Sequence, residues 1–259
     1  MKTQAISILL VLSACVHLST AADPETLRIM TYNIHHCEGV DGKIDIGRIA
    51  GIIQKSQCDL VALQEVDRRT TRSNQVDQLA ELAQLTGLHG YFGKAIDYAG
   101  GEYGVAILSR YPATSEQTIK LPSAKSREQR VALQILLEPD SHIPFTFVST
   151  HLDHSSGEND RSDQNAAIVK RFSGSPQPVV LAGDFNSTAK QPELSTILSK
   201  WTDVDAAKLT PTIPVHKPTR KIDFIFLPLD SPWKVEAARV LDEPIASDHL
   251  PLMATLKLN

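Results

Sequence analysis

Short apolar runs, rich in β-branched residues and spread along the whole chain, limit the fold more than any other feature of the sequence. They occupy residues 27–34, 60–64, 104–108, 131–137, 145–150, 179–182, 222–227, 235–240 and 252–258. Runs of this length and composition are typical of buried strands. Helical periodicity is clearest at 45–55, from 76 to 83 and at 165–172, with Asp45 and Gly87 as cap residues for the first two. The sequence therefore predicts an α/β protein.

Two local patterns predict that parallel and antiparallel strands are mixed. The run at 27–34, the helix at 45–55 and the run at 60–64 form a βαβ unit, whose right-handed crossover makes the two strands parallel. The turn sequence Glu138-Pro139-Asp140-Ser141 separates two apolar runs and predicts an antiparallel hairpin. No Pro/Gly/Ser-rich linker divides the chain, so we expect one domain over residues 23–259, with mixed sheets covered by helices.

The N-terminus has the layout of an export signal. Met1 and Lys2 precede an apolar run at 5–16, and small residues at 19–22 suit cleavage by signal peptidase. We predict a signal peptide over 1–22 and an exported protein, either secreted or periplasmic. The alternative is a membrane-anchored lipoprotein, because Leu12-Ser13-Ala14-Cys15 resembles a bacterial lipobox and would leave Cys15 lipidated. The run is shorter than the ~20 apolar residues that span a bilayer, which disfavours a permanent transmembrane anchor.

Cys37 and Cys58 remain in the mature chain, an even number that would allow a disulfide in an exported protein. The predicted topology argues against that bond. Cys37 follows one strand of the βαβ unit, whereas Cys58 precedes its parallel neighbour. A strand of roughly 17–20 Å therefore separates them, well beyond the ~7 Å Cα limit for a disulfide. We expect two free thiols.

The charge of the chain gives no sign of a polyanionic partner. The formal net charge is −4, whereas tight binding to duplex nucleic acid rests on clustered Lys and Arg. Arg68, Arg69 and Arg72 form one local basic group, which is either a phosphate contact or a solvated charged turn. Hydrophobic residues at 42% and charged residues at 22% are typical of a soluble globular enzyme and exclude a disordered chain.

Polar clusters repeatedly follow the apolar runs. They are Thr31-Tyr32-Asn33, Gln64-Glu65, Thr150-His151-Leu152-Asp153, Gly183-Asp184-Phe185-Asn186 and Ser247-Asp248-His249. Open sheets place their functional sites at strand ends. A single cluster of this kind would indicate only a solvated loop, whereas their recurrence along one chain predicts a functional site.

These clusters, in this order, resemble the signature of the endonuclease/exonuclease/phosphatase superfamily, the DNase I and exonuclease III type, over residues 27–258. Gly-Asp-Phe-Asn and Ser-Asp-His are the most specific of the motifs. The resemblance implies the four-layer α/β sandwich of the DNase I type, in which two mixed β-sheets pack together and helices flank them. It also implies a hydrolase that acts on phosphoester bonds.

The resemblance further implies a divalent metal ion, Mg²⁺ or Mn²⁺, held by hard oxygen ligands. Three residues are implied to be the metal site: Asn33, Glu65 and Asp248. Phosphoester cleavage also needs a deprotonated nucleophile and donors for the charge that develops on the phosphoryl group. The metal ion and the residues that surround it are implied to supply these parts together.

Five residues are implied to be catalytic: His151, Asp184, Asn186, Asp223 and His249. Asp184 is implied to orient or deprotonate the attacking water, while Asn186 and His151 hold the phosphoryl oxygens. His249 is implied to contact the phosphate beside Asp223, and an adjacent carboxylate raises the pKa of a histidine and orients its ring. Asp223 could instead be a structural hydrogen-bonding residue, as Asn33 could be a strand-end turn residue.

Some positions depart from the pattern of the superfamily. Tyr103 falls one position away from a tyrosine that abasic-site nucleases use, and we assign it no catalytic role. His35 stands where those nucleases carry a second acidic residue, so their metal site does not transfer in full. An alternative zinc site would use four loop histidines, His35, His36, His151 and His154. Their adjacent and i,i+3 spacing is not a reliable zinc pattern.

Three functions are compatible with these residues. They are a phosphodiesterase or phosphatase of small molecules or lipid headgroups, a secreted nuclease, and an inactive binding module on the same scaffold. The complete set of metal, water-activating and phosphate-holding residues disfavours the third. The acidic net charge favours the first over the second, with nucleic acid kept as an alternative substrate. No stable protein partner is implied, so we expect a monomer.

Overall fold

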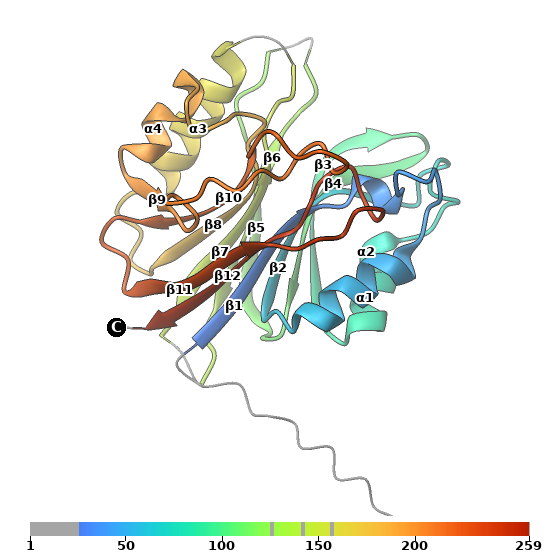
Figure 1. Cartoon of the computed structure of the whole chain (residues 1–259), viewed down its shortest axis with the longest axis horizontal. Coiled ribbons are helices and arrows are strands. Elements are labelled where there is room, and N and C mark those ends of the chain that lie inside the picture. Colours follow the sequence, from blue (N-terminus) through green and yellow to red (C-terminus); the bar gives the residue numbers. More distant parts are fainter. Residues whose placement is uncertain (1–25, 125–126, 141–142, 156–157, 259) are drawn as a thin grey trace, which may run out of the picture.

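The computed structural model describes residues 26–124, 127–140, 143–155 and 158–258, which form two six-stranded sheets (Figure 1). In spatial order the first sheet contains β11 (Trp233–Val240), β12 (Leu252–Leu258), β1 (Thr26–Asn33), β2 (Leu60–Arg68), β4 (Gly101–Ser109) and β3 (His89–Tyr98). The second contains β5 (Ala113–Lys120), β6 (Val131–Leu137), β7 (Phe145–His151), β8 (Val179–Asp184), β10 (Asp223–Pro228) and β9 (Trp201–Asp203). The pairs β1–β2 and β7–β8 are parallel, and the other neighbouring strands are antiparallel. The prediction of mixed sheets is confirmed.

Helices cover the outer face of each sheet (Figure 1). The first sheet is covered by α1 (Ile46–Ser56) and α2 (Gln78–Thr86), and the second by α3 (Glu158–Phe172) and α4 (Ser195–Leu198). Three hydrophobic clusters fill the spaces between these layers, one between the sheets and one under each group of helices. This four-layer sandwich is the architecture that the resemblance implies, and that prediction is confirmed.

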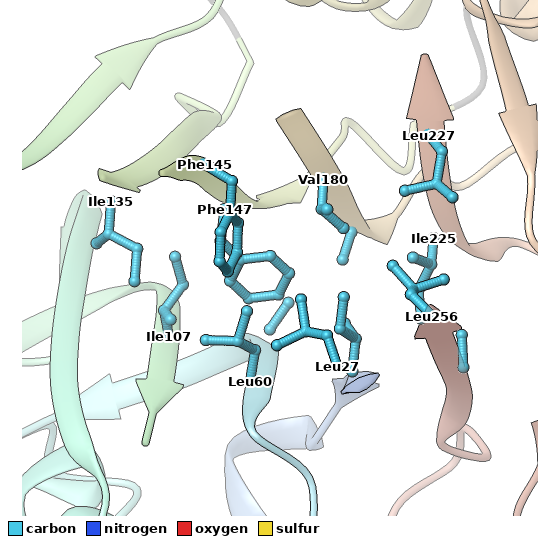
Figure 2. Close-up of a cluster of buried hydrophobic side chains, with 14 of the residues drawn as sticks. Leu27, Leu60, Ile107, Ile135, Phe145, Phe147, Val180, Ile225, Leu227 and Leu256 are labelled. Atoms are coloured by element: carbon cyan, nitrogen blue, oxygen red, sulfur yellow. The ribbon is translucent and has the colours of Figure 1, made fainter. Parts of the chain in front are cut away.

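The cluster between the sheets fixes their relative position. Figure 2 shows side chains from both sheets pointing toward one another. Leu27, Leu60 and Ile107 come from the first sheet, Phe147 and Val180 come from the second, and all are fully buried. Burying one such side chain contributes roughly 1.5–3 kcal/mol. A rigid contact between the sheets holds the loops at the strand ends in fixed positions, which a functional site built on both sheets requires.

Local signals in the sequence account for the helix boundaries. The side chain of Asp45 accepts a hydrogen bond from the backbone N–H of Arg48, and Gly87 ends α2 in the left-handed conformation. The helix predicted at 165–172 is the second half of the longer α3. Three strands were not predicted, namely β3, β5 and β9, and all lie at sheet edges. In β5 most side chains are exposed, so that strand has no apolar run to reveal it.

The cysteine topology agrees with the sequence argument. Cys37 follows β1, Cys58 precedes its parallel neighbour β2, and both thiols are free and buried. In the described part of the chain no helix is both long and apolar enough to cross a membrane. The predicted signal peptide at 1–22, with the alternative lipidation site at Cys15, lies outside the described residues.

Candidate active site

Strands from both sheets meet at one edge of the sandwich, and the predicted site residues lie there. β1 ends at Asn33, β7 at His151 and β8 at Asp184. β10 runs antiparallel to β8, so its first residue, Asp223, pairs with Asp184. Asn33 Nδ2 reaches across from the first sheet and donates to Asp184 Oδ2 at 3.1 Å. The fold therefore brings distant parts of the chain together in one site.

The centre of the site is a buried cluster of Asp184, Asp223 and His249, none of which is more than 4% exposed. His249 Nδ1 lies 2.9 Å from Asp223 Oδ2, and His249 Nε2 lies 3.7 Å from Asp184 Oδ2. The hydroxyl of Thr212 donates to the same Asp223 oxygen at 2.5 Å. Asp223 thus holds the imidazole in one orientation, with Nε2 on the side of Asp184.

The members of the buried cluster shift one another's pKa. Burial, followed by the charge of Asp223, raises the pKa of Asp184 to about 7. Burial alone would lower the pKa of His249, but the Asp223 carboxylate outweighs that effect and raises the pKa to about 10. At neutral pH His249 is therefore a cation, and Asp184 titrates close to the pH at which it would act.

The turn after β8 depends on two special backbone positions. A Cβ at Gly183 would lie 2.1 Å from the carbonyl oxygen of Thr150 on β7, so only glycine permits this approach of the two strands. Asn186 has φ = +49°, a conformation that asparagine tolerates better than most residues. Its backbone N–H donates to Asp184 Oδ1 at 2.8 Å. The turn therefore fixes the Asp184 carboxylate.

His151 and Asn186 face each other across this turn. Asn186 Nδ2 donates to the carbonyl oxygen of Leu152 and to His151 Nε2, both at 3.0 Å. His151 Nε2 must then carry the lone pair, which places the proton of the neutral ring on Nδ1. Burial, together with the charge of Arg130, lowers the pKa of His151 well below its usual value, in agreement with a neutral ring.

A second group, the Glu65 cluster, comprises Glu65, His35 and His36. One ligand atom from each side chain lies within 4.8 Å of the others. Glu65 has φ = +58°, at a point where the register of β2 against β4 shifts between Leu63 and Val66. A bulge of this kind redirects a side chain, and a left-handed non-glycine residue costs roughly 1–3 kcal/mol. The local distortion of β2 positions the Glu65 carboxylate in the site.

Asn33 connects the two clusters. Its Nδ2 lies 3.1 Å from Glu65 Oε1 and 3.1 Å from Asp184 Oδ2. The hydroxyl of Ser247 donates to the Asn33 carbonyl oxygen at 2.7 Å and thereby anchors the loop before β12. Asp248 follows in that loop with a half-buried side chain, whose Oδ1 lies 3.3 Å from Ser247 Oγ. The predicted metal ligands therefore border the buried cluster.

The donor atoms near Glu65 fit a small divalent cation better than those of the buried cluster do. Glu65 and Asp248 offer half-buried carboxylates, and the Asn33 amide lies beside Glu65. Oxygen donors that remain open to water suit Mg²⁺ or Mn²⁺, because these ions keep several waters. Asp184, Asp223 and His249 also have ligand atoms within 4.8 Å of one another. There, however, the imidazole of His249 already pairs with the carboxylate of Asp223.

A family model described as the Endonuclease/Exonuclease/phosphatase family matches residues 30–249. The chain belongs to this family. Similar solved structures include an endonuclease/exonuclease/phosphatase from Beutenbergia cavernae, with 26% identity, a TM-score of 0.77, and coverage of 91% of this chain and 72% of that one. A second, from Bacteroides vulgatus, has 22% identity, a TM-score of 0.75 and coverage of 90% and 99%. A mannosyl-6-phosphatase from Bacteroides thetaiotaomicron has 20% identity, a TM-score of 0.72 and coverage of 89% and 99%. No curated protein matches the chain.

Family membership gives the reaction class. Members of the endonuclease/exonuclease/phosphatase family are hydrolases that act on phosphoester bonds, and this chain is an enzyme of that class. Its predicted site residues are gathered at the edge described above: Asn33, Glu65, His151, Asp184, Asn186, Asp223, Asp248 and His249. The individual roles predicted for them remain predictions.

The four histidines considered for zinc do not form one group in the part of the chain that the structure describes. His35 and His36 belong to the Glu65 cluster, whereas His151 bonds across the turn after β8. His154 Nδ1 lies 2.9 Å from an Nη of Arg130. Because the four histidines have separate partners in the described part of the chain, they do not together form a zinc site there.

Arg130 is a site residue that the sequence reasoning missed. It is only 3% exposed and immediately precedes β6. Because β6 is antiparallel to β7, the start of β6 lies beside the end of β7, where His151 stands. A search restricted to residues that follow strands does not find such a position. A charged residue directly before an antiparallel strand was the available signal.

The basic group at the end of β2 and in the following loop is largely neutralised by ion pairs. Arg72 donates to the buried Asp67 carboxylate through Nε at 2.7 Å and through Nη2 at 2.8 Å. Arg68 Nη1 lies 3.1 Å from Glu102, and Arg69 is exposed. Paired guanidinium groups attract a polyanion less strongly than free ones. These ion pairs favour the interpretation of Arg68 and Arg72 as part of a charged turn over their interpretation as a phosphate contact.

Proposed function

We propose that this protein hydrolyses phosphoesters in a reaction that depends on bound Mg²⁺ or Mn²⁺. The observation that carries the proposal is the position of the Asn33 amide, which bonds at 3.1 Å to both Glu65 and Asp184. A candidate metal ligand and a candidate base thus stand on either side of one side chain. A phosphate bound at this point would meet both.

The metal ion would be held by Asn33, Glu65 and Asp248, and when bound it supplies positive charge to the phosphoryl oxygens. The half-buried carboxylates of Glu65 and Asp248 leave that position open to water and to substrate. The carboxylate of Glu65 accepts a hydrogen bond from the neutral amide of Asn33, and that of Asp248 accepts one from the hydroxyl of Ser247. Their negative charge therefore remains available for a cation.

Asp184 is the proposed base. Its raised pKa of about 7 leaves a substantial carboxylate fraction at neutral pH and makes that carboxylate a stronger proton acceptor than an ordinary aspartate. The backbone N–H of Asn186 and the amide of Asn33 fix its two oxygens. In this role Asp184 orients the attacking water and accepts its proton.

His249 is the proposed donor to the phosphate. Asp223 keeps the ring cationic at neutral pH, so Nε2 carries a proton that it can share with a phosphoryl oxygen as negative charge develops. His151 and Asn186 are proposed to hold the other phosphoryl oxygens. Both N–H groups of the Asn186 amide are already used, so this residue must release His151 Nε2 before it can donate to a substrate.

We infer that the substrate is a small-molecule or lipid-headgroup phosphoester rather than duplex nucleic acid. The net charge of −4 and the ion pairs of Arg68 and Arg72 offer little free positive surface to a polyanion. One structure with the same fold is a mannosyl-6-phosphatase, which supports a small substrate. The layout of residues 1–22 supports export, and we propose a monomer that acts outside the cytoplasm.

The proposal is tested with purified protein, Mg²⁺ or Mn²⁺, and a panel of phosphoesters. The panel contains plasmid DNA, RNA, sphingomyelin, phosphatidylinositol, and simple phosphate monoesters and diesters. We expect hydrolysis of at least one small phosphoester, its loss in excess EDTA and its return when Mg²⁺ or Mn²⁺ is added in excess. Full turnover in EDTA would contradict the metal requirement. Faster cleavage of DNA or RNA than of every small ester would establish the nuclease alternative.

A further inference from the structure

Two buried glutamines, Gln78 and Gln164, occupy equivalent places in the two halves of the fold. If the second sheet is followed in the reverse spatial order, its parallel and antiparallel strand pairs fall at the same places as those of the first sheet. In this comparison β2, which carries Glu65, corresponds to β7, which ends at His151. The helix that follows each of these strands in the chain covers the outer face of its sheet (Figure 1). Gln78 lies on one of these helices, α2, and Gln164 lies on the other, α3.

Both glutamines accept a hydrogen bond from the backbone just beyond a predicted site residue. Gln78 Oε1 accepts from the backbone N–H of Asp67 at 2.9 Å, and Gln164 Oε1 accepts from the backbone N–H of Asp153 at 3.0 Å. Asp67 stands two residues beyond the predicted metal ligand of β2, and Asp153 stands two residues beyond the histidine that ends β7. In both halves the glutamine lies 11 residues further along the chain. The two side chains therefore make the same contact with corresponding strands.

The second bond of Gln78 reaches the turn after β1. Gln78 Nε2 donates to the carbonyl oxygen of His36 at 2.6 Å. Residues 35–37 of this turn have φ values between +41° and +61°, and Glu65 has φ = +58°. Residues other than glycine keep a left-handed conformation only where surrounding contacts hold them there. The Gln78 amide thus joins the strained segment beyond Asn33 to the backbone beyond Glu65.

The second bond of Gln164 reaches a different part of the site. Gln164 Nε2 donates to the carbonyl oxygen of Pro122 at 3.0 Å. The neighbouring Leu121 donates its backbone N–H to the carbonyl oxygen of Arg130 at 2.9 Å. Gln164 thus joins the segment beyond His151 to the loop that leads into β6. Both of its partners lie outside the segments that carry the predicted metal ligands.

We propose that Gln78 and Gln164 are positioning residues with separate targets. Gln78 places the Glu65 carboxylate and the Asn33 amide, and thereby sets the affinity of the proposed metal site. Gln164 places His151, and thereby sets the binding of phosphate. The inference rests on the proposed function and deepens it, because it divides the positioning of the metal ion and of the phosphate between two helices.

Substitution by methionine removes the bonds of each glutamine while it nearly keeps the length of the side chain. His36, Asp67 and Asp153 are buried, so water does not easily replace the lost amide. A buried backbone group that loses its partner shifts toward another one. Loss of a group that orients metal ligands typically weakens metal binding by about 10–100-fold. Each variant should therefore disturb the site residue on its own strand.

The first experiment measures Mn²⁺ binding by electron paramagnetic resonance, without substrate and without turnover. We expect the Kd for Mn²⁺ to rise at least about fivefold in Gln78→Met. In Gln164→Met the Kd should stay within about twofold of wild type. This readout does not depend on hydrolysis of any phosphoester.

The second experiment measures the binding of inorganic phosphate by calorimetry at saturating Mg²⁺. We expect the Kd for phosphate to rise at least about fivefold in Gln164→Met and to stay within about twofold of wild type in Gln78→Met. At the same Mg²⁺ concentration, kcat/KM on a phosphoester should fall at least about fivefold in Gln164→Met, whereas Gln78→Met should recover the wild-type value.

Gln54→Met is the matched control for the loss of a glutamine that bonds to the backbone. Gln54 lies on α1 and donates through Nε2 to the carbonyl oxygen of Leu85 at 2.7 Å, at the opposite end of α2 from Gln78. We expect it to change neither the Mn²⁺ affinity nor the phosphate affinity. If a methionine variant does not fold, Gln78→Asn and Gln164→Asn keep an amide of shorter reach. They should show the same separate effects at smaller size.

Separate effects, with Gln78→Met weakening only Mn²⁺ binding and Gln164→Met weakening only phosphate binding, would support the inference. Weakening of both ligands to the same degree in both variants would overturn it, because a general loss of stability moves the two affinities together. Unchanged affinities in both variants would also overturn it. Separate effects without hydrolysis of any phosphoester would support the inference and contradict the proposed function. Failure of the wild type to bind Mn²⁺ would contradict both.

Discussion

The buried cluster and the Glu65 cluster lie on either side of Asn33, but their side chains are buried to different degrees. Asp223 binds both His249 and Thr212, and no member of the buried cluster is more than 4% exposed. In the Glu65 cluster His36 is buried, but Glu65 and His35 are only half buried. Removing one partner from a buried charge pair costs roughly 3–5 kcal/mol, so the buried cluster must form together with the fold. The half-buried Glu65 is instead proposed to hold an exchangeable metal ion together with Asn33 and Asp248.

Asp184→Asn should have the largest effect and tests whether the buried cluster performs the chemical step. The amide keeps the shape of the side chain and can still accept from the N–H of Asn186, but it cannot deprotonate water. General-base assistance is worth ~10²–10⁴-fold, so kcat should fall at least about 100-fold. Steady-state kinetics and a thermal melt measure the two effects, and the Tm should be nearly unchanged. Retention of more than about a tenth of wild-type kcat would show that Asp184 does not activate the water.

Asp223→Asn should have the next largest effect, because it leaves His249 without its anionic partner. We expect kcat to fall roughly 10–100-fold, since the imidazole loses the charge that it shares with the phosphate. The variant removes the charged partner from a buried pair, so we expect a loss of stability of roughly 3–5 kcal/mol, measured by chemical unfolding. A variant with wild-type kcat would remove His249 from the proposed mechanism.

The same variant gives a pH test of the buried cluster. Burial alone would lower the pKa of His249, but Asp223 raises it from 6.5 to about 10. The stability that the pair contributes is therefore fully present below pH 6.5 and is lost as the pH rises through about 10. The difference in Tm between wild type and Asp223→Asn should be wider near pH 6 than near pH 10. A difference that widens with rising pH would contradict the pairing.

Glu65→Gln tests the other side of the comparison and should change metal binding rather than chemistry. A neutral amide binds a divalent cation more weakly than a carboxylate does, so the Mg²⁺ concentration for half-maximal activity should rise at least about tenfold. Glu102→Gln is the control, because Glu102 lies on β4 and its carboxylate pairs with Arg68 of β2 and Lys94 of β3. An unchanged Mg²⁺ dependence in Glu65→Gln would show that the metal ion binds elsewhere.

His35→Gln should have the smallest effect and sharpens the choice of metal. His35 Nδ1 lies 3.1 Å from the carbonyl oxygen of Glu38, and Mg²⁺ prefers oxygen ligands. We expect kcat/KM with Mg²⁺ to stay within about threefold of wild type. Loss of activity that only Zn²⁺ restores would instead support a zinc site in the Glu65 cluster.

The sequence predicted the parts of the site that follow buried strands. Apolar runs mark those strands, and Asp184 and His151 stand at their carboxyl ends, where parallel neighbours terminate together. Arg130 was missed because it precedes an antiparallel strand, and β5 was missed because an exposed edge strand needs no apolar run. A pattern of polar residues that follow buried apolar strands therefore reveals Asp184 and His151, but it does not reveal Arg130 or β5.

Backbone distortions and distances between the sheets could not be read from the sequence. Nothing in Leu63-Gln64-Glu65-Val66 marks a bulge, since no glycine or proline accompanies the positive φ of Glu65. The contact between Asn33 and Asp184 joins residues 151 positions apart and depends on how the two sheets pack. Only the tertiary structure shows that one amide serves both clusters.

The most direct test of the account is a Mg²⁺ titration of the activity of wild type, Glu65→Gln and Asp184→Asn on one phosphoester. If Glu65 holds the metal ion and the buried cluster activates water, the Glu65→Gln curve moves to higher Mg²⁺ and approaches the wild-type maximum. The Asp184→Asn curve then keeps the wild-type midpoint, with a maximum at least about 100-fold lower at every Mg²⁺ concentration. Recovery of Asp184→Asn at high Mg²⁺, or an unmoved midpoint for Glu65→Gln, would contradict this division between the clusters.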